Sequence, residues 1–456
     1  MERPDENSPS FKLLIPLFLG VLTGALDIAM VGPGLSSIQD YFELDARIGT
    51  WIIGLFALFT LVGVPAMAWI ADNIGKRRSF LISTGLFVAG ALTCFSAPTV
   101  PVLFAGRILQ GLGAAGVFPV ASAVVGDVVA PSNRGKFLGI LGSVFGVAFL
   151  VGPAASGILL LAGWRYIFLF SVPIGLGAFL LGWRMLPKSD AGTKVSELDV
   201  PGLLLMTGFV GLLAFALNGI DNSDLVSSLG STRFIGFFAA SMVALTLFVI
   251  QERRASNPIV RPGLFSFPGV RLTVLLAAGA GICEAALVFT AAFAVSLFEV
   301  DASTAGFMFL PLAGSIAVAS PLLGRLLDSL GSGRMVVAGS LILTAGLLIF
   351  ANTDTLLHFY AGSVLIGIGQ ASLLGSTLNY IMLGAAPERD RATAQGFITL
   401  SLNLGIVVGS AIIGAIAASA DNLAAGYATA FGSVSIVAAL MAGAGFLVRR
   451  SLTPDS

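Results

Sequence analysis

The chain has 456 residues, of which 56% are hydrophobic and only 11% charged, and its mean hydropathy is +0.97. Soluble globular domains carry about 25% charged residues, so this composition excludes a soluble protein and predicts an integral membrane protein. Basic and acidic residues balance, so the net charge gives no sign of a nucleic-acid partner. Two separated Cys residues and one His indicate neither a disulfide framework nor a metal site.

Fourteen apolar segments follow one another along the chain, and each can cross a bilayer as a helix of roughly 20 residues. They cover approximately 11–35, 48–71, 79–97, 101–129, 136–161, 165–186, 200–219, 232–251, 268–298, 303–327, 333–351, 356–383, 392–418 and 425–448. With the N-terminus in the cytoplasm, 20 of the 24 Lys and Arg residues fall on the cytoplasmic side, as the positive-inside rule requires. The sequence therefore predicts a multi-pass protein of the cytoplasmic membrane with both termini in the cytoplasm.

The second half of the chain repeats the first at a constant offset of 256 residues, so that Asp72 recurs as Asp328. Spans one to six pair with spans nine to fourteen, and spans seven and eight have no counterpart. Two copies of a membrane-embedded unit are typical of secondary transporters, whose substrate path lies between the copies. We therefore predict two six-helix bundles with an inserted two-helix hairpin. The three parts cover residues 1–187, 264–456 and, for the hairpin with its linkers, 188–263.

Five segments carry a resemblance to a known family. They are residues 26–31 with an acid in span one, 72–77 after span two, 107–115 in span four, 139–157 in span five and 163–175 entering span six. In these segments the chain resembles the major facilitator superfamily, and within it the fourteen-span drug:proton antiporters. Ala68, Ala148 and Ser156 stand where the family has Gly. The resemblance implies the all-α fold of that family, with fourteen transmembrane helices.

Two acids inside spans are the first candidates for chemistry. Asp27 lies in span one and Glu284 in span nine, one residue from Cys283, which the repeat offset pairs with Asp27. A carboxylate in lipid costs roughly 2.5–3.5 kcal/mol and marks a functional site, and burial favours the neutral form, which lets the group exchange protons. We expect both acids to face a central cavity, as proton sites or as sites for a cationic substrate. A structural carboxyl group held by hydrogen bonds is the alternative.

Arg107 is the one basic residue well inside a span, and because it stays charged it needs a partner, for which Asp27 is a candidate. The resemblance places Arg107 and Gln110 near the proton path; a structural ion pair between spans one and four is the alternative. Further polar residues of late spans could line the cavity or serve as hydrogen-bonding contacts between helices. They are Gln370, Asn379, Tyr380 and Asn403.

The charged loop after span two and its copy after span ten form a second candidate site. The resemblance implies a cytoplasmic gate built from Asp72, Gly75, Lys76, Arg77, Asp127, Asp328, Gly331 and Arg334. The offset carries Asp127 to Leu383, so we expect a weaker gate in the second half. General positive-inside charge would explain the basic residues, but not an Asp/Gly/basic pattern that recurs at one offset.

Span five resembles the antiporter motif of the family, carried by Gly139, Gly152, Pro153 and Gly157. Pro153 removes one helical hydrogen bond and would kink the span, and the glycines allow close helix packing. The resemblance implies a hinge and a seal against leakage. Ordinary glycine packing in a membrane helix is the alternative for each glycine taken singly.

These features predict a secondary transporter that exports amphipathic organic compounds by alternating access, with protons as the coupling ion and no cofactor. The chain lacks a nucleotide-binding loop and a nucleophilic triad, so we expect neither ATP coupling nor an enzyme. We expect a monomer in the lipid bilayer, with a small-molecule substrate and no nucleic-acid partner. Three alternatives stay open: a lipid, glycolipid or metabolite transporter on the same fold, a proton-coupled nutrient importer, and a membrane sensor that does not transport.

Overall fold

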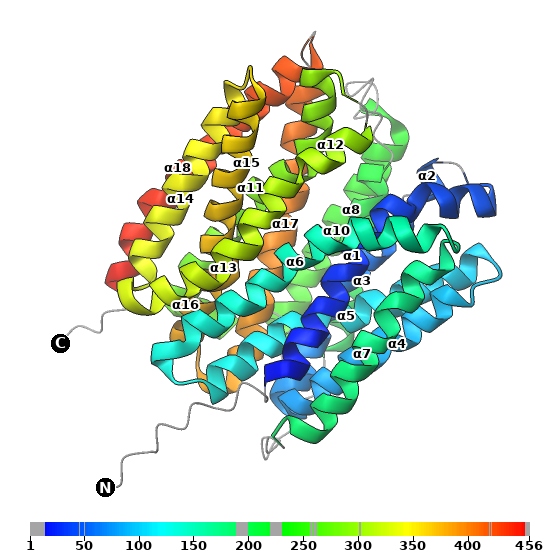
Figure 1. Ribbon diagram of the computed structural model, residues 1–456. Coiled ribbons are helices and arrows are strands. Elements are labelled where there is room, and N and C mark those ends of the chain that lie inside the picture. Colours follow the sequence, from blue (N-terminus) through cyan, green and yellow to red (C-terminus); the bar gives the residue numbers. More distant parts are fainter. Residues whose placement is uncertain are drawn as a thin grey trace, which may run out of the picture.

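The structure is a computed structural model. It describes residues 14–44, 46–49, 51–187, 199–218, 230–255, 258, 262–300, 302–418, 420 and 422–451. Every secondary-structure element in these ranges is a helix (Figure 1). The linkers predicted on either side of span seven, residues 188–198 and 219–229, lie outside the described residues.

The first bundle, called the N half below, holds six long helices. Its elements are α1 (Ile15–Phe42), α2 (Ala46–Gly49), α3 (Trp51–Asn73), α4 (Lys76–Phe95), α5 (Val100–Val128), η2 (Pro131–Asn133), α6 (Arg134–Leu160) and α7 (Arg165–Met185). Helix α1 packs on α5, α6 and α7, while α5 also packs on α3 and α4. Most of these helices carry an interior Pro, which membrane helices tolerate because neighbouring helices satisfy the freed backbone groups.

The second bundle, the C half, repeats this arrangement. It consists of η3 (Pro262–Ser266), α11 (Pro268–Phe298), α12 (Ala302–Met308), α13 (Leu310–Leu330), α14 (Ser332–Ala351), α15 (Leu356–Ser372), the π-helical turn η4 (Leu373–Thr377), α16 (Leu378–Ala385), η5 (Glu388–Asp390), α17 (Arg391–Ala418) and α18 (Leu423–Ser451). Helix α11 packs on α16, α17 and α18, as α1 does on its counterparts. Aromatic rings fill the core, with the Phe293 and Phe431 ring centroids 5.1 Å apart, in the range that favours aromatic pairs.

The predicted hairpin consists of α8 (Val200–Asn218) and α10 (Thr232–Arg254), which pack on each other. Of the N half, α8 contacts α3, and the Trp51 and Phe215 ring centroids lie 4.4 Å apart. The exposed side of α10 is apolar and includes Ile235, Val243 and Leu247. The hairpin is therefore attached to the outside of the N half.

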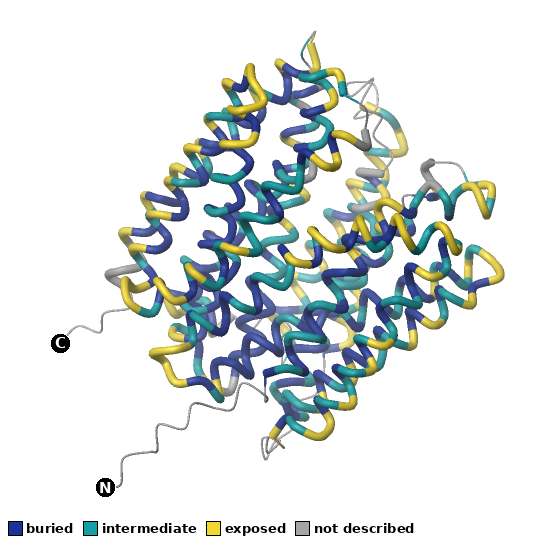
Figure 2. Tube along the Cα trace, in the orientation of Figure 1, coloured by how far each residue is buried: buried dark blue, intermediate teal, exposed yellow. Residues whose placement is uncertain are grey.

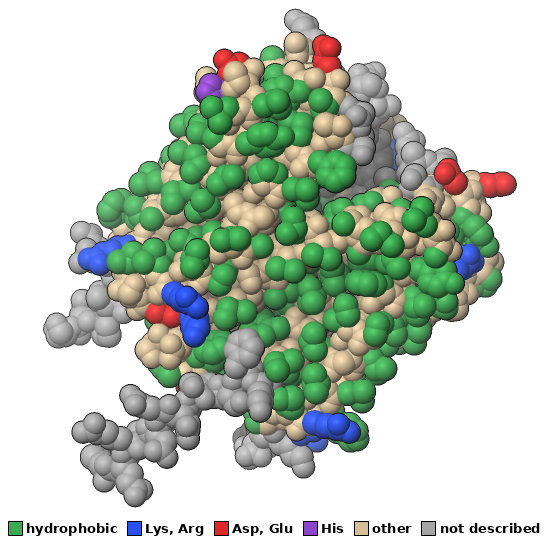
Figure 3. Space-filling model, in the orientation of Figure 1, with side chains coloured by type: hydrophobic (Ala, Val, Ile, Leu, Met, Phe, Trp, Pro, Cys, Tyr) green, Lys and Arg blue, Asp and Glu red, His purple; other side chains and the backbone are tan. Residues whose placement is uncertain are grey.

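Thirteen helices in the described part of the chain are long and apolar enough to cross a membrane. The remaining predicted span is α8, whose described apolar part, Val200–Leu213, is shorter. A wide band of hydrophobic side chains covers the molecule between its two ends (Figure 3), and exposed positions lie mainly on the outward faces of helices and in loops (Figure 2). The fold is the all-helical membrane architecture that the sequence predicted.

The two halves meet at one end of the molecule and separate toward the other. We call the end where α1 begins and α18 ends the terminal side, and the opposite end the far side (Figure 1). The main contacts between the halves join α6 to α13 and α3 to α17. The α6–α13 contact reaches from Gly135 to Gly146, where an added Cβ would lie 2.4 Å from the backbone nitrogen of Ala317.

Beyond Gly146, α6 contacts its own half instead. Gly152 lies against Ala29 of α1, and Val147, Leu150 and Val151 are exposed. The far side of the molecule is hollowed between the ends of the two halves (Figure 3). The structure therefore represents a state that is closed on the terminal side and open on the far side.

Candidate functional site

Asp27 lies in the interior of the N half, where both of its carboxylate oxygens accept hydrogen bonds from α5. Arg107 donates from Nη1 to Oδ2 at 2.6 Å, and Gln110 donates from Nε2 to Oδ1 at 2.8 Å. Asp27 is 3% exposed and Arg107 1% exposed. The ion pair suggested by the sequence is thus formed, and it is shielded from solvent.

Further groups complete the surroundings of Arg107. Its Nε donates to the backbone oxygen of Ile52 on α3 at 2.7 Å, and Nη1 also donates to Oε1 of Gln110 at 2.9 Å. The guanidinium carbon lies 4.5 Å from the centre of the Phe56 ring, a favourable cation–π arrangement. A buried charge is tolerated only when it is paired and hydrogen-bonded, and here α1, α3 and α5 together supply the partners.

The Asp27 carboxylate balances the charge of Arg107 in this network. Protonation of Asp27 would remove the negative charge that balances Arg107 and weaken the charge-assisted hydrogen bond between them. Because Arg107 cannot lose its own proton, the helices would have to rearrange to compensate it. We define the switch as Asp27, Arg107 and Gln110.

Helices α1 and α11 are symmetry-related, but Asp27 and Glu284 do not occupy equivalent faces of these two helices. The repeat offset pairs Asp27 with Cys283 and Ile28 with Glu284. Asp27 and Cys283 are buried, whereas Ile28 is 46% exposed and Glu284 is partly exposed. The expectation that both acids face a common cavity is therefore wrong for Asp27, because neighbouring residues of a helix point about 100° apart.

The other polar candidates make contacts mainly within the C half. Gln370 donates to the backbone oxygen of Ala280 at 3.3 Å, which links α15 to α11. Asn379 is buried, donates to the backbone oxygen of Leu374 at 3.2 Å and accepts at its own backbone oxygen from Gln395. Tyr380 is half-buried beside apolar residues of the N half, and Asn403 donates to the backbone oxygen of Thr399 within α17.

The loop after α3 is organised by Gly75 and two basic residues. Gly75 has φ +106°, and its counterpart Gly331 has φ +82°; such positive φ angles favour glycine. Lys76 forms an ion pair with Asp127 at the end of α5, while Arg77 donates to the backbone oxygen of Trp183 on α7. The two basic residues thus tie α4 to two other helices of its half.

Asp127 also forms an ion pair across the interface between the halves. Arg391, the first residue of α17, donates from Nη1 to Oδ1 of Asp127 at 2.8 Å, and its Nη2 lies 3.3 Å from Oε1 of Glu388. Asp127 therefore holds Lys76 of its own half and Arg391 of the other half together. These ion pairs hold the two halves together on the terminal side.

The two loop aspartates make reciprocal contacts with the opposite half. Asp72 of α3 accepts from the Thr393 hydroxyl in the first turn of α17. Asp328 of α13 accepts from the backbone N–H groups of Gly135 at 2.9 Å and Lys136 at 3.0 Å, in the first turn of α6. A carboxylate is stabilised at a helix N-terminus by the free N–H groups and the helix dipole. Each half thus supplies an acid to a helix N-terminus of the other.

The sequence prediction did not include Arg391 and Thr393. A signal for them existed, because the repeat offset aligns the start of α17 with that of α6, where Arg134 and Lys136 form a basic cluster. The second-half loop also differs from the first: Arg334 is exposed at the start of α14. In the second half, Asp328 contacts the backbone of α6. The repeat offset pairs Asp127 with Leu383, and this apolar residue packs against Gly126.

The antiporter-like segment of α6 forms the seam between the halves. Added Cβ atoms would lie 2.4 Å from the Ser320 backbone oxygen at Gly139, and 2.4 Å from the Gly375 Cα at Gly142. Gly157, by contrast, has no neighbour within 4 Å of such an atom. Pro153 lies inside α6. Ser156 donates to the backbone oxygen of Met30 at 2.8 Å. Ser156, which stands where the family has Gly, thus joins α6 to α1.

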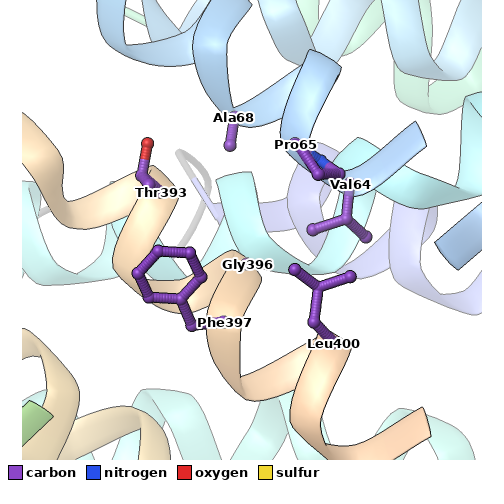
Figure 4. A pocket seen from close by; sticks show the side chains of 7 residues that line it. All are labelled: Val64, Pro65, Ala68, Thr393, Gly396, Phe397 and Leu400. Atoms are coloured by element: carbon purple, nitrogen blue, oxygen red, sulfur yellow. The ribbon is translucent and has the colours of Figure 1, made fainter. Parts of the chain in front are cut away.

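Helices α3 and α17 leave a small gap where they approach each other on the terminal side (Figure 4). It is lined by Val64, Pro65, Ala68, Thr393, Gly396, Phe397 and Leu400. The side chain of Val64 comes within 2.9 Å of a Cβ added at Gly396. This part of the interface is thus packed from both halves, in agreement with a closed terminal side.

Comparison with known proteins assigns the chain to a family. The family model described as Major Facilitator Superfamily matches residues 17–283 and 273–456, so it matches twice and covers nearly the whole chain. The protein belongs to the Major Facilitator Superfamily. The second match lies within the second copy of the repeat, and the first match covers the first copy together with the inserted hairpin and the start of α11.

This chain is similar in sequence to named members of the Major Facilitator Superfamily. The chain is 28% identical over 425 residues to the multidrug resistance protein Stp of Mycobacterium tuberculosis, covering 91% of this chain and 77% of that protein. It is 26% identical over 415 residues to the tetracenomycin C resistance and export protein of Streptomyces glaucescens, covering 89% and 76%. The crystal structure of the human organic anion transporter MFSD10 (TETRAN) matches with a TM-score of 0.71 at 16% identity, covering 97% of this chain and 100% of that one. The last likeness supports the fold.

Proposed function

We propose that this Major Facilitator Superfamily protein exports amphipathic organic compounds across the cytoplasmic membrane in exchange for protons, by alternating access. The relatives named for drug resistance and export support the substrate class and the direction. The observation that supports protons as the coupling ion is the buried switch of Asp27, Arg107 and Gln110, since ionisable residues inside membrane spans commonly mark proton pathways.

Two helices connect the switch to the closed end of the molecule. Helix α5 carries Arg107 near its far end and the Gly126–Asp127 contacts with the C half at its terminal end. Helix α3 supplies the Ile52 oxygen to Arg107 and, at its other end, Asp72 to α17. A rearrangement around a protonated Asp27 would therefore act on two of the contacts that hold the terminal side shut.

A transport cycle follows from this connection. In the state described here, Asp27 pairs with Arg107 and the terminal side is closed. Proton uptake from the far side would break the pair, loosen the Asp127–Arg391 and Asp72–Thr393 contacts and allow the terminal side to open. Proton release on the terminal side would restore the closed state. This return step would carry substrate in the direction opposite to that of the proton. The positive-inside distribution of Lys and Arg supports a terminal side that faces the cytoplasm.

The test is transport into or out of proteoliposomes with an imposed pH gradient, comparing the native protein with Asp27→Asn. The proposal predicts that a proton gradient drives substrate uphill with the native protein, and that the variant keeps only exchange of labelled for unlabelled substrate. An equal response of both proteins to the gradient would contradict the assignment of Asp27. Inward accumulation of substrate along with the proton would identify an importer.

A further inference from the structure

Two phenyl rings from different helices pack on the guanidinium group of Arg107. Its Cζ atom lies 4.5 Å from the ring centre of Phe56 on α3 and 5.8 Å from the ring centre of Phe168 on α7. Both distances fall within the roughly 6 Å over which a ring attracts a cation, and the attraction grows when the cation is shielded from water. Phe56 is 4% exposed, and Phe168 is fully buried. The two rings are therefore electrostatic partners of the charge as well as packing neighbours.

The rings differ from Asp27 in how they respond to a proton. Asp27 balances the charge of Arg107 only while the carboxyl group is ionised. Its protonation leaves Arg107 with the Ile52 and Gln110 oxygens and the two rings, and Arg107 keeps its charge. The negative face of an aromatic ring does not titrate. When Asp27 is neutral, the rings thus supply a larger share of the electrostatic stabilisation that a buried cation needs.

The sequence repeat shows that the two rings occur together with the charge. At the offset of 256 residues, the counterparts are Ser363 for Arg107, Leu312 for Phe56 and Ala424 for Phe168. The C half thus lacks the cation and both rings at the corresponding positions. It fills its core with aromatic rings at other positions, so the pairing of these two rings with Arg107 favours a role that is tied to the cation.

The surrounding helices offer Arg107 no second charged partner at this depth among their described residues. Cys94 of α4 is the titratable group nearby, with its Sγ atom 3.4 Å from Oε1 of Gln110. Apart from Asp27 and Arg107, every charged side chain of α1 and of α3 to α7 lies in the first or last turn of its helix. An unpaired Arg107 is therefore left with neutral hydrogen-bond acceptors and the two rings.

We propose that Phe56 and Phe168 are positioning residues that form an aromatic berth for Arg107 when Asp27 is protonated. The guanidinium group, released by the neutral carboxyl group, moves onto the rings, mainly toward Phe168, which lies at the longer distance. The berth lowers the cost of leaving Arg107 without its counter-charge and so makes protonation of Asp27 attainable. The inference rests on the proposed proton-coupled function and adds the residues that hold the charge after proton uptake.

Fluorination of the rings tests the berth, because fluorine weakens the negative face of a ring with little change in its size. 3,4,5-Trifluorophenylalanine replaces Phe56 or Phe168 in the native protein and in Asp27→Asn, which holds position 27 neutral at every pH. Unfolding in dodecyl sulfate, followed by circular dichroism, gives the unfolding equilibrium constant. Fluorination should raise this constant roughly 2- to 30-fold more in Asp27→Asn than in the native background, the span of cation–π strengths. Equal effects in the two backgrounds would overturn the proposal.

Phe87 provides a matched control for this comparison. It is 2% exposed and belongs to the same apolar cluster as Phe56. Fluorination of Phe87 should change the unfolding constant by the same factor in both backgrounds. A control that distinguishes the backgrounds as strongly as Phe168 does would show that the effect comes from general packing, and this result would also overturn the berth.

Proton binding separates the berth from the proposed function. The titration curve of the native protein in weakly buffered detergent, minus that of Asp27→Asn, gives the proton bound by Asp27. Fluorination of Phe168 should move the midpoint of this difference to lower pH, because a weaker berth raises the free energy of the protonated state. A midpoint that stays constant or rises would contradict the berth. A stability effect specific to Asp27→Asn, with no proton bound by Asp27 at any pH, would refute the proposed coupling and leave the berth standing.

Discussion

Removing either charge of the Asp27–Arg107 pair should destabilise the protein more than removing both. Both side chains are 1% exposed, and Arg107 Nη1 lies 2.6 Å from Asp27 Oδ2. Breaking such a buried pair from one side leaves an uncompensated charge and costs about 3–5 kcal/mol, whereas replacing both charged groups is often close to neutral. We therefore expect Asp27→Asn and Arg107→Gln each to lose about 3–5 kcal/mol, and the double variant to recover most of it.

The chain offers a reporter for this measurement. Cys94 and Cys283 are free and buried, so a thiol-reactive dye labels them only when the protein opens. Cys94 Sγ lies 3.4 Å from Gln110 Oε1, so all four proteins should carry Cys94→Ser and report through Cys283, which lies in the other half. Unfolding by detergent at equilibrium would then give the free energy of each variant.

The double-mutant cycle should yield a coupling free energy of about 3 kcal/mol or more in favour of the pair, within the range measured for close charge pairs. Losses that simply add would mean that each charge is stabilised by other groups. In that case the Asp27–Arg107 contact could not act as a switch, because breaking it would leave no charge uncompensated.

Three further predictions concern the interface and α6. Asp127→Asn removes two ion pairs at a partly exposed site, worth about 1 kcal/mol together, and should increase labelling of Ala68→Cys by an impermeant maleimide about fivefold. Gly142→Ala places a Cβ 2.4 Å from the Gly375 Cα and should largely abolish transport through overpacking of about 1–3 kcal/mol, whereas Gly157→Ala should transport normally. Ser156→Ala should lower stability by only about 0.6 kcal/mol, the typical contribution of one hydrogen bond between membrane helices, as detergent unfolding will show.

Unchanged labelling of the Asp127→Asn protein would show that charge does not hold the terminal side shut. Normal transport by Gly142→Ala would show that the α6–η4 contact does not form during the cycle. A loss of several kcal/mol for Ser156→Ala would mean that this hydroxyl has a larger role than linking α6 to α1.

Much of the fold could be predicted from sequence because apolar length and the distribution of basic residues set the spans, and the 256-residue repeat pairs them. The Asp27–Arg107 contact was within reach as well, since a permanent charge inside a span requires an opposite charge nearby. Gly75 and Gly331 mark turns with positive φ, which is why glycine recurs in both loops.

The sequence did not predict that the Asp27 side chain points into its own bundle. The position of a residue along a helix can be read from the sequence, but the face of the helix that packs against its neighbours cannot. A difference of one residue between Asp27 and Ile28 decides whether the acid is enclosed or exposed. Contacts between the halves depend on how two bundles dock in one state of the cycle. The repeat offset marks the start of α17, but helical patterns do not show its partners, so the contacts of Arg391 with Asp127 and of Thr393 with Asp72 emerged only from the structure.

The most direct test of the central claim, that Asp27 is the site where proton and substrate are coupled, is proton release from the purified protein in weakly buffered detergent. The titrants are lipophilic cations, neutral drugs and lipids, added to the native protein and to Asp27→Asn. The account predicts that a bound substrate releases protons from the native protein and none from the variant. Equal release from both proteins, or calorimetric binding without any release, would contradict it.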